Sequence, residues 1–384
     1  MRTLRRRLAL VVPAAAALAA CQPHQLGTFL PRAVDETYVY TDCDIVEQAQ
    51  ALDVGIQRVQ QVVDTTGLNS TVRTLHDAGI EAQLTFKANP GVSGALLPDD
   101  PRVPGDENAA RGTTVTEYRG QLGRRLDEYR ALTGASAPMI AIENEANHGQ
   151  FYAGTAADYL TELRIAVDVA HRRGVEITDS GIGTKAVKLV VWNHLRTTAG
   201  SAKADRYLRT VFRSTSDSND TILRDQLLGA AIDDPDPYAR VNPTIRGNWQ
   251  DAETMLAAYG TGPGDLRLDA VNFHWYTPDE PNPTTYSDRR ALTDTIDALR
   301  AITGLPVVTN EIGQHGTDPE AVSTSLEVTV RERDLALVIW FDADGTPAHG
   351  LFHPTDPGRL RASGRTFRNY TDEIPYPPSA CGRR

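Results

Sequence analysis

The chain of 384 residues is long enough for one large domain or two ordinary ones. With 40% hydrophobic and 23% charged residues its composition is that of a globular protein, which excludes wholesale disorder and fibrous repeats. The formal charge is −11 and no strong basic cluster lies beyond the N-terminus, so we expect no nucleic acid partner, while three cysteines are too few for a disulfide scaffold.

The first twenty residues have the pattern of a signal peptide. Arg2, Arg5, Arg6 and Arg7 form a basic region that precedes the apolar stretch Leu8–Ala20. This stretch is too short to span a bilayer comfortably and ends in Leu-Ala-Ala before Cys21, which resembles the lipobox of bacterial lipoproteins. The resemblance implies lipidation of Cys21, a cell-surface location and membrane contact only through that lipid. The alternative is an ordinary secretory peptide that leaves the protein secreted or periplasmic; both interpretations predict export.

Export also bears on the two remaining cysteines, Cys43 and Cys381. They stand near the two ends of the mature chain, in a compartment that permits disulfides. Two interpretations stay open: a bridge that ties the C-terminal tail to the start of the domain, or two thiols.

Short apolar or β-branched runs alternate with helical patterns along the rest of the chain. The predicted strands are Thr37–Thr41, Gly55–Val63, Ala82–Lys87, Met139–Glu145, Val175–Gly181, Ala270–Tyr276, Pro306–Ile312 and Leu335–Phe341. Helices are predicted from their apolar spacing at Tyr118–Leu132, Tyr159–Arg173 and Arg290–Ile302, and several end at a glycine, as at Gly79, Gly174 and Gly304. Eight strands that alternate with helices predict an α/β fold, the (β/α)8 TIM barrel.

The chain exceeds the roughly 250 residues of a typical barrel, and the surplus falls in two insertions. One is Ala88–Thr114 after the third strand, and the other is Thr184–Leu268 after the fifth, with helices expected around Val187–Arg213 and Asp251–Tyr259. We see no boundary for a second domain. The expected organisation is a signal peptide at 1–20, a linker at 21–35, the barrel at 36–374 and a tail at 375–384.

Two predicted strands end in glutamate. The fourth ends in Glu143-Asn144-Glu145-Ala146-Asn147, and the seventh in Thr309-Asn310-Glu311-Ile312-Gly313. Burial and neighbouring charges at strand ends can tune the pKa of a carboxyl group. A pair of carboxyl groups across a cleft is what cleavage of a glycosidic bond needs, since one donates a proton and the other acts as nucleophile or base.

These motifs resemble those of the clan A glycoside hydrolases, retaining (β/α)8 enzymes with an Asn-Glu pair on strand four and a glutamate nucleophile on strand seven. The resemblance implies that Glu145 is the acid/base and Glu311 the nucleophile. It also implies that the substrate is bound by Asn144, by His274 and Tyr276 of a His-x-Tyr pattern on strand six, and by Trp340 on strand eight. No cofactor is implied, and the nine histidines show no metal-ligand spacing.

The sequence departs from its relatives at two charged positions. The usual arginine position on strand two falls on Gln60, with Arg58 two residues earlier, and Glu143 replaces a common tryptophan. Because alternate side chains of a strand share a face, we expect Arg58 and Glu143 one layer below the site, as an ion pair. The alternative is a register shift that leaves one or both of them outside the barrel. If the pair forms, Glu143→Gln should destabilise the protein by roughly 3–5 kcal/mol.

The sequence therefore predicts an exported, monomeric, retaining O-glycoside hydrolase acting on an oligo- or polysaccharide without a cofactor or metal. The alternative is a carbohydrate-binding surface lipoprotein that kept the barrel and lost turnover. A pure binder has no need of the pair Glu145 and Glu311, which favours the enzyme.

Overall fold

The computed structural model describes residues 25–371 except 31–32, 36–37, 98, 100–112, 215–217, 231–233, 235, 261–264, 279, 281, 283, 343–349 and 354–355. The predicted signal peptide, Cys21, Cys381 and the C-terminal tail lie outside the described residues, and so does most of the insertion after the third strand. The predicted disulfide and lipidation therefore stay predictions. Cys43 lies exposed at the start of the first helix.

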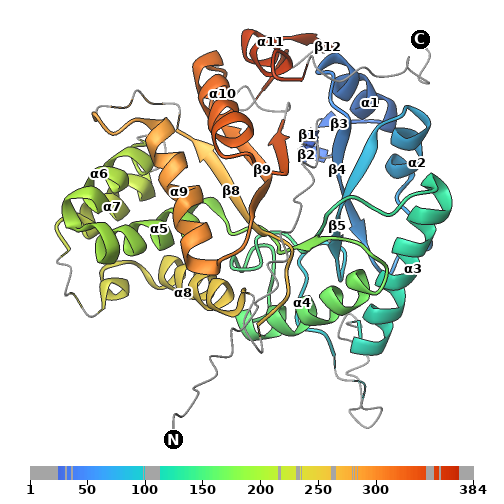
Figure 1. Cartoon of the computed structure of the whole chain (residues 1–384), viewed down its shortest axis with the longest axis horizontal. Coiled ribbons are helices and arrows are strands. Elements are labelled where there is room, and N and C mark those ends of the chain that lie inside the picture. Colours follow the sequence, from blue (N-terminus) through green and yellow to red (C-terminus); the bar gives the residue numbers. More distant parts are fainter. Residues whose placement is uncertain are drawn as a thin grey trace, which may run out of the picture.

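Eight parallel strands form the centre of the fold, which confirms the (β/α)8 barrel (Figure 1). They are β1 (Gln25–Phe29), β4 (Ile56–Val62), β5 (Glu81–Lys87), β6 (Ile140–Ile142), β7 (Ile177–Thr178), β8 (Val271–Thr277), β9 (Val307–Gln314) and β10 (Leu337–Phe341). Their order is β7-β6-β5-β4-β1-β10-β9-β8. Parallel bridges from Thr178 to Ala270 and from Ile182 to Phe273 bring β7 next to β8 and close the circle.

The predicted first strand is wrong, and the predicted linker contains the true one. Strand β1 pairs with β4 and β10, whereas only Tyr38–Val39 of the predicted segment forms a strand (β3), paired with β2 (Ala33–Asp35) outside the barrel. The five residues of β1 contain a glycine in the middle, so their sequence did not indicate a strand. Yet Gly27 is required there, because a Cβ at this position would lie 2.3 Å from the carbonyl oxygen of Ile56.

Helices cover the outside of the barrel. They are α1 (Asp42–Ala51), α2 (Ser70–Asp77), α3 (Val115–Thr133), α4 (Ala156–His171), α5 (Thr184–Ala199), α6 (Ser201–Val211), α7 (Ser218–Leu227), α8 (Pro243–Ala258), α9 (Asp288–Thr303), α10 (Pro319–Leu326) and α11 (Ala362–Arg368), with a 3-10 turn η1 (Pro237–Arg240), a π-helical turn η2 (Glu327–Glu332) and a hairpin of β11 (Phe352–His353) and β12 (Asp356–Leu360). The predicted glycine stops are confirmed, since Gly79, Gly174 and Gly304 have φ of 76°, 65° and 70°.

Two apolar clusters fill the structure. The larger lies between the strands and the helices. The smaller fills the barrel interior with alternate residues of the strands, among them Phe29, Ile56, Val308, Leu337 and Ile339. This alternation decides which residues at the strand ends face the mouth of the barrel.

The predicted insertion after the fifth strand is confirmed as the helical group α5–α8, which Figure 1 shows on the left and lower side of the barrel. Its apolar side chains continue the larger apolar cluster, in which Trp192 of α5 and Trp249 of α8 are fully buried with ring centroids 5.8 Å apart. Because this group follows a strand end, it stands beside the face where such barrels carry their sites.

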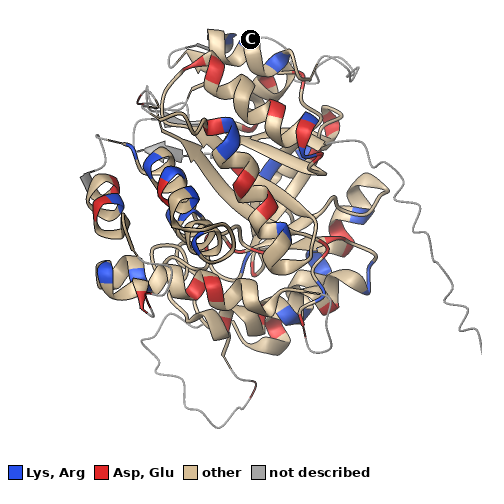
Figure 2. Ribbon diagram, turned by 60° about the vertical axis from the view of Figure 1, so that its left-hand side comes forward, with Lys and Arg blue, Asp and Glu red and all other residues tan. Residues whose placement is uncertain are grey.

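No helix among the described residues is long and apolar enough to cross a membrane. In the view of Figure 2, acidic and basic residues are interspersed along the outer helices.

Candidate active site

Glu145 is presented by a turn with left-handed backbone at the end of β6. The strand stops at Ile142, and φ is 63° at Glu143 and 42° at Glu145. Ser180, just after β7, holds this turn: its carbonyl oxygen accepts from Glu145 N at 3.0 Å and its hydroxyl from Ala146 N at 3.0 Å. Left-handed backbone is unfavourable for a non-glycine residue and persists only where the surroundings impose it.

A bulge in β9 turns Glu311 toward the barrel interior. In the pairing with β8, Asn272 is opposite Val308 but His274 is opposite Glu311, so β9 carries one extra residue between the two pairs. Such a bulge re-aims the side chains that follow it. Asn310 and Glu311 both reach the interior as a result: Asn310 Oδ1 accepts from Asn272 Nδ2 at 2.7 Å, and Glu311 contacts Tyr276 of β8.

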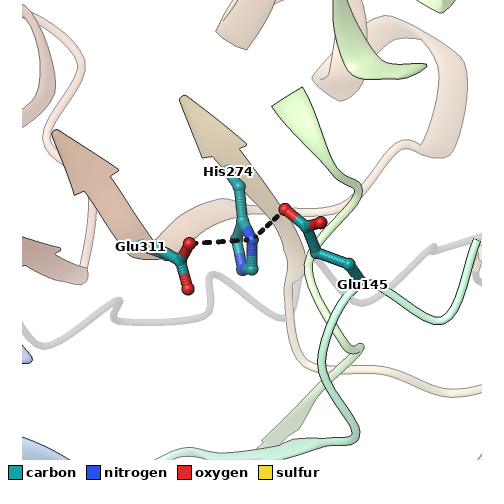
Figure 3. Close-up of side chains that lie close together, drawn as sticks. All are labelled: Glu145, His274 and Glu311. Carbon is teal, nitrogen blue, oxygen red and sulfur yellow. Dashed lines mark hydrogen bonds and ion pairs between the residues drawn. The ribbon is translucent and has the colours of Figure 1, made fainter. Parts of the chain in front are cut away.

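His274 lies between the two glutamates, as Figure 3 shows. Its Nδ1 is 2.8 Å from Glu145 Oε1 and 3.7 Å from Glu311 Oε1. Its Nε2 is 3.0 Å from Asn310 Oδ1, an acceptor, so Nε2 carries a hydrogen. The hydroxyl of Tyr276 donates to Glu311 Oε1 at 2.9 Å. The four predicted residues from strands four, six and seven therefore converge on one site.

Arg58 of β4 is the charged residue beneath the site, and its predicted partner is wrong. Its guanidinium donates to Glu311 Oε2 at 2.8 Å and to Asn144 Oδ1 at 2.5 Å, not to Glu143. The Arg58 side chain is fully buried, whereas Gln60 is exposed. Arg58, and not Gln60 two residues later, is therefore the residue of β4 that reaches the candidate nucleophile.

Glu143 faces the layer of helices instead of the barrel interior. Its Oε1 accepts from the backbone N–H of Ala88 at 2.5 Å, and its carboxyl group contacts Glu162 of α4. The expectation that Glu143 shares a face with Glu145 is wrong because the strand ends at Ile142. The left-handed conformation of Glu143 breaks the alternation of side chains.

The surroundings of Glu311 favour its ionised form. Burial by itself would raise the pKa of Glu311, but the charges of His274 and Arg58 and the hydrogen bond from Tyr276 outweigh it and hold the pKa below its ordinary value. Burial would lower the pKa of His274, but the nearby carboxylates of Glu311 and Glu145 raise it above its ordinary value. Burial, followed by the charge of Glu311, raises the pKa of Tyr276, so its phenol remains a donor. Glu311 is therefore held ionised, as a nucleophile must be.

Trp340 does not reach the site, so the predicted sugar platform on this residue is contradicted. Its side chain is fully buried on the helix side of β10, with its ring centroid 6.0 Å from that of Phe367 in α11. The next residue, Phe341, points inward and is partly exposed, 5.6 Å from the ring of Phe29 and 5.9 Å from that of Tyr276. A shift of one residue along a strand exchanges its two faces, which the sequence motif could not reveal.

Three residues of the site were missed or misplaced by sequence reasoning. The role of Arg58 required the strand register, and Asn310 required the bulge. Phe341 carried one usable signal, the alternation Leu337-x-Ile339-x-Phe341 that places it on the same face as the barrel interior.

Two open cavities lie next to the strand ends that carry the carboxylates, and several of their lining residues follow these strand ends in the chain. One, of about 890 Å³, follows β8 and β9 and is lined by Thr277, Gln314 and His315 among others. The other, of about 540 Å³, is lined by Ala146 and Asn147 just after Glu145 and by residues of α8. Both volumes lie in the range of about 300–1,000 Å³ typical of ligand sites.

Glu145, His274 and Glu311 also offer three donor atoms within 4.8 Å of one another, a spacing that a metal ion could use. The surroundings do not fit one, because both oxygens of Glu311 already accept hydrogen bonds, from Tyr276 and Arg58. The buried guanidinium supplies the positive charge that a cation would bring. The arrangement fits proton and glycosyl transfer better than metal binding.

Comparisons with known proteins show similarity in fold. No protein-family model matches the sequence, and no curated protein matches it. Among solved structures, the chain is similar to a GH128 (subgroup II) endo-β-1,3-glucanase from Sorangium cellulosum at 13% identity and TM-score 0.48, covering 90% of this chain and 98% of that one. It is similar to a GH128 (subgroup I) endo-β-1,3-glucanase from Amycolatopsis mediterranei in complex with laminaritriose at 12% identity and TM-score 0.46, covering 90% and 99%.

A third similar structure is an exo-β-1,4-mannosidase from an Opitutaceae bacterium, at 12% identity and TM-score 0.48, covering 91% of this chain and 59% of that one. At these identities the similarity extends to the fold alone.

Proposed function

We propose that the protein is a retaining O-glycoside hydrolase that cleaves an oligo- or polysaccharide by double displacement. The observation that carries this proposal is the pairing of Glu145 and Glu311. Each offers a carboxylate oxygen within 4.8 Å of the other, close to the spacing of about 5–5.5 Å in retaining enzymes and shorter than the roughly 6.5–9.5 Å that leaves room for water in inverting ones.

Glu311 is the nucleophile in this mechanism. Its carboxylate attacks the anomeric carbon as the bond to the leaving oxygen breaks, which forms a glycosyl-enzyme ester. Arg58 and Tyr276 keep the carboxylate ionised and oriented. Asn144, whose oxygen is held by Arg58, directs its amide nitrogen to the sugar 2-hydroxyl, a contact that strengthens in the transition state.

Glu145 is the acid/base. The hydrogen bond between Glu145 Oε1 and His274 Nδ1 contains a proton that can reside on either group, and the first step uses it on Glu145 to protonate the leaving oxygen. The resulting carboxylate then deprotonates the water that hydrolyses the ester. Because one group must be ionised and the other protonated, kcat/KM should have a bell-shaped pH dependence.

The decisive experiment is hydrolysis of a panel of aryl glycosides and wall polysaccharides by purified protein, with Glu145→Gln and Glu311→Gln as controls. We expect a first product of retained anomeric configuration by NMR and labelling of Glu311 by a 2-fluoro glycoside of the accepted sugar. Inversion would contradict double displacement. Glycan binding that is equal in wild type and both variants, without hydrolysis, would favour the carbohydrate-binding lipoprotein instead.

We also propose that the protein is exported and anchored by lipid at Cys21. The support is the basic region, the short apolar stretch and the Leu-Ala-Ala sequence before this cysteine. In a bacterial host, labelled palmitate should enter the wild type and not Cys21→Ala, which should move from the membrane to the soluble fraction. Equal labelling of both proteins would contradict the proposal.

A further inference from the structure

A second pair of carboxyl groups lies directly behind the catalytic turn. Glu143 precedes Asn144 and Glu145 in that turn, and Glu162 lies in the middle of α4. Both side chains belong to residues with no exposed surface. The proposed mechanism uses neither group.

The contacts of this pair favour a shared proton. Glu143 Oε1 accepts from Ala88 N, and Glu162 Oε2 accepts from the Tyr152 hydroxyl at 3.4 Å. The hydroxyls of Ser93 and Tyr118 lie near the two carboxyl groups, but no well-formed hydrogen bond from the described residues reaches Glu143 Oε2 or Glu162 Oε1. The two carboxyl groups also act on each other. Two buried carboxylates side by side repel each other and offer only acceptors, so a proton on one of them stabilises the pair.

Burial of the pair favours retention of that proton. Tyr118 of α3, Tyr159 of α4 and Tyr152 before α4 face the pair, and Lys87 at the end of β5 is the cation that acts on Glu143. Burial raises the pKa of Glu143 to about 7, although Ala88, Ser93 and Lys87 act in the opposite direction. Burial, followed by the proximity of Glu143, raises the pKa of Glu162 well above its ordinary value.

We propose that Glu143 and Glu162 share a single proton, and that this proton holds in place the turn that carries Asn144 and Glu145. Glu143 is then a positioning residue for the acid/base. This inference rests on the proposed glycosidase function. Loss of the proton places two negative charges side by side in a closed space, and repulsion acts on the strained turn, since Glu162 is fixed within a helix.

The first test compares Glu143→Leu with Glu143→Gln in the full chain, using phenyl and 2,4-dinitrophenyl glycosides of the same sugar. A dinitrophenolate leaves with little protonation, so a displaced Glu145 should slow the phenyl substrate most. We expect Glu143→Leu to lose at least about tenfold more kcat/KM on the phenyl than on the dinitrophenyl glycoside, within the contribution of a general acid. Glu143→Gln, whose amide can accept from Ala88 N and donate to Glu162, should restore both. Equal losses on both substrates would overturn the proposal.

The second test needs neither a substrate nor Glu143→Leu, so it holds even if loss of the Ala88 contact prevents that variant from folding. Infrared difference spectra of the wild type between about pH 6 and pH 9 should show the loss of a protonated carboxyl band, since Glu143, whose pKa burial raises to about 7, titrates in this range. The band should be absent in both Glu143→Gln and Glu162→Gln. If it persists in both variants, the shared proton is refuted. If it behaves as expected but no glycoside is cleaved, the pair stands and the glycosidase proposal fails.

Discussion

Replacement of Glu143 by glutamine should make the stability of the protein less sensitive to alkaline pH. Burial raises the pKa of the Glu143 carboxyl group from its ordinary value of 4.5 to about 7. The folded protein therefore binds a proton between these two pH values that the unfolded chain has released, and its free energy of unfolding falls as the pH rises through this window. Below pH 4.5 the free energy of unfolding is not reduced by this group, and well above pH 7 the reduction is complete.

The size of the effect follows from the shift. About 1.4 kcal/mol per pKa unit gives a loss of about 3 kcal/mol for the shift of Glu143. Glutamine cannot ionise, so the free energy of unfolding of Glu143→Gln relative to wild type should rise by about 3 kcal/mol between about pH 5 and pH 8. The destabilisation of Glu143→Gln expected from the sequence assumed an ion pair with Arg58, which instead contacts Glu311 and Asn144.

Urea denaturation at the two pH values, followed by tryptophan fluorescence, measures this difference. Glu162→Gln is the matched variant on the other side of the pair and should show a change of the same sign. Glu320→Gln, at an exposed position on α10, is the control and should track the wild type. If Glu143→Gln and wild type lose stability in parallel between the two pH values, the shared proton and the reasoning from burial are both wrong.

Three further outcomes are expected. Arg58→Met removes a cation that lowers the pKa of Glu311. The acidic limb of the pH profile of kcat/KM should therefore move to higher pH by about 1–3 units. An unchanged limb would exclude Arg58 as the group that keeps the nucleophile ionised. Tyr276→Phe removes one hydrogen bond to the nucleophile and should lower kcat/KM by about ten- to a hundredfold, measured at the pH optimum, where a loss below twofold would argue against the contact. Trp340→Ala should destabilise the protein by about 3–5 kcal/mol in urea titrations and leave KM unchanged. Phe341→Ala should raise KM with a smaller change in stability. The reverse pattern would indicate that Trp340, and not Phe341, contacts the sugar.

The sequence by itself determined the barrel and the two catalytic candidates. Apolar runs alternating with helical patterns predicted seven of the eight strands, because burial on both faces and regular spacing leave their mark in the composition of each segment. The glutamates at the ends of two of these strands predicted the pair, because parallel strands of a barrel end on the same face. The first strand was not predicted because the five residues around Gly27 have few features typical of a strand. Its position is set by pairing with β10 and β4.

The direction of each side chain at the strand ends was decided by the tertiary structure alone. The bulge in β9 turned Glu311 inward, the left-handed turn after β6 sent Glu143 outward, and the register of β10 buried Trp340 and exposed Phe341. Each depends on one residue of register or one backbone angle, and a shift of that size exchanges the two faces of a strand without altering its composition. Arg58 contacts Glu311 and not Glu143 because packing across the barrel, between segments far apart in the chain, sets the partner of a buried charge.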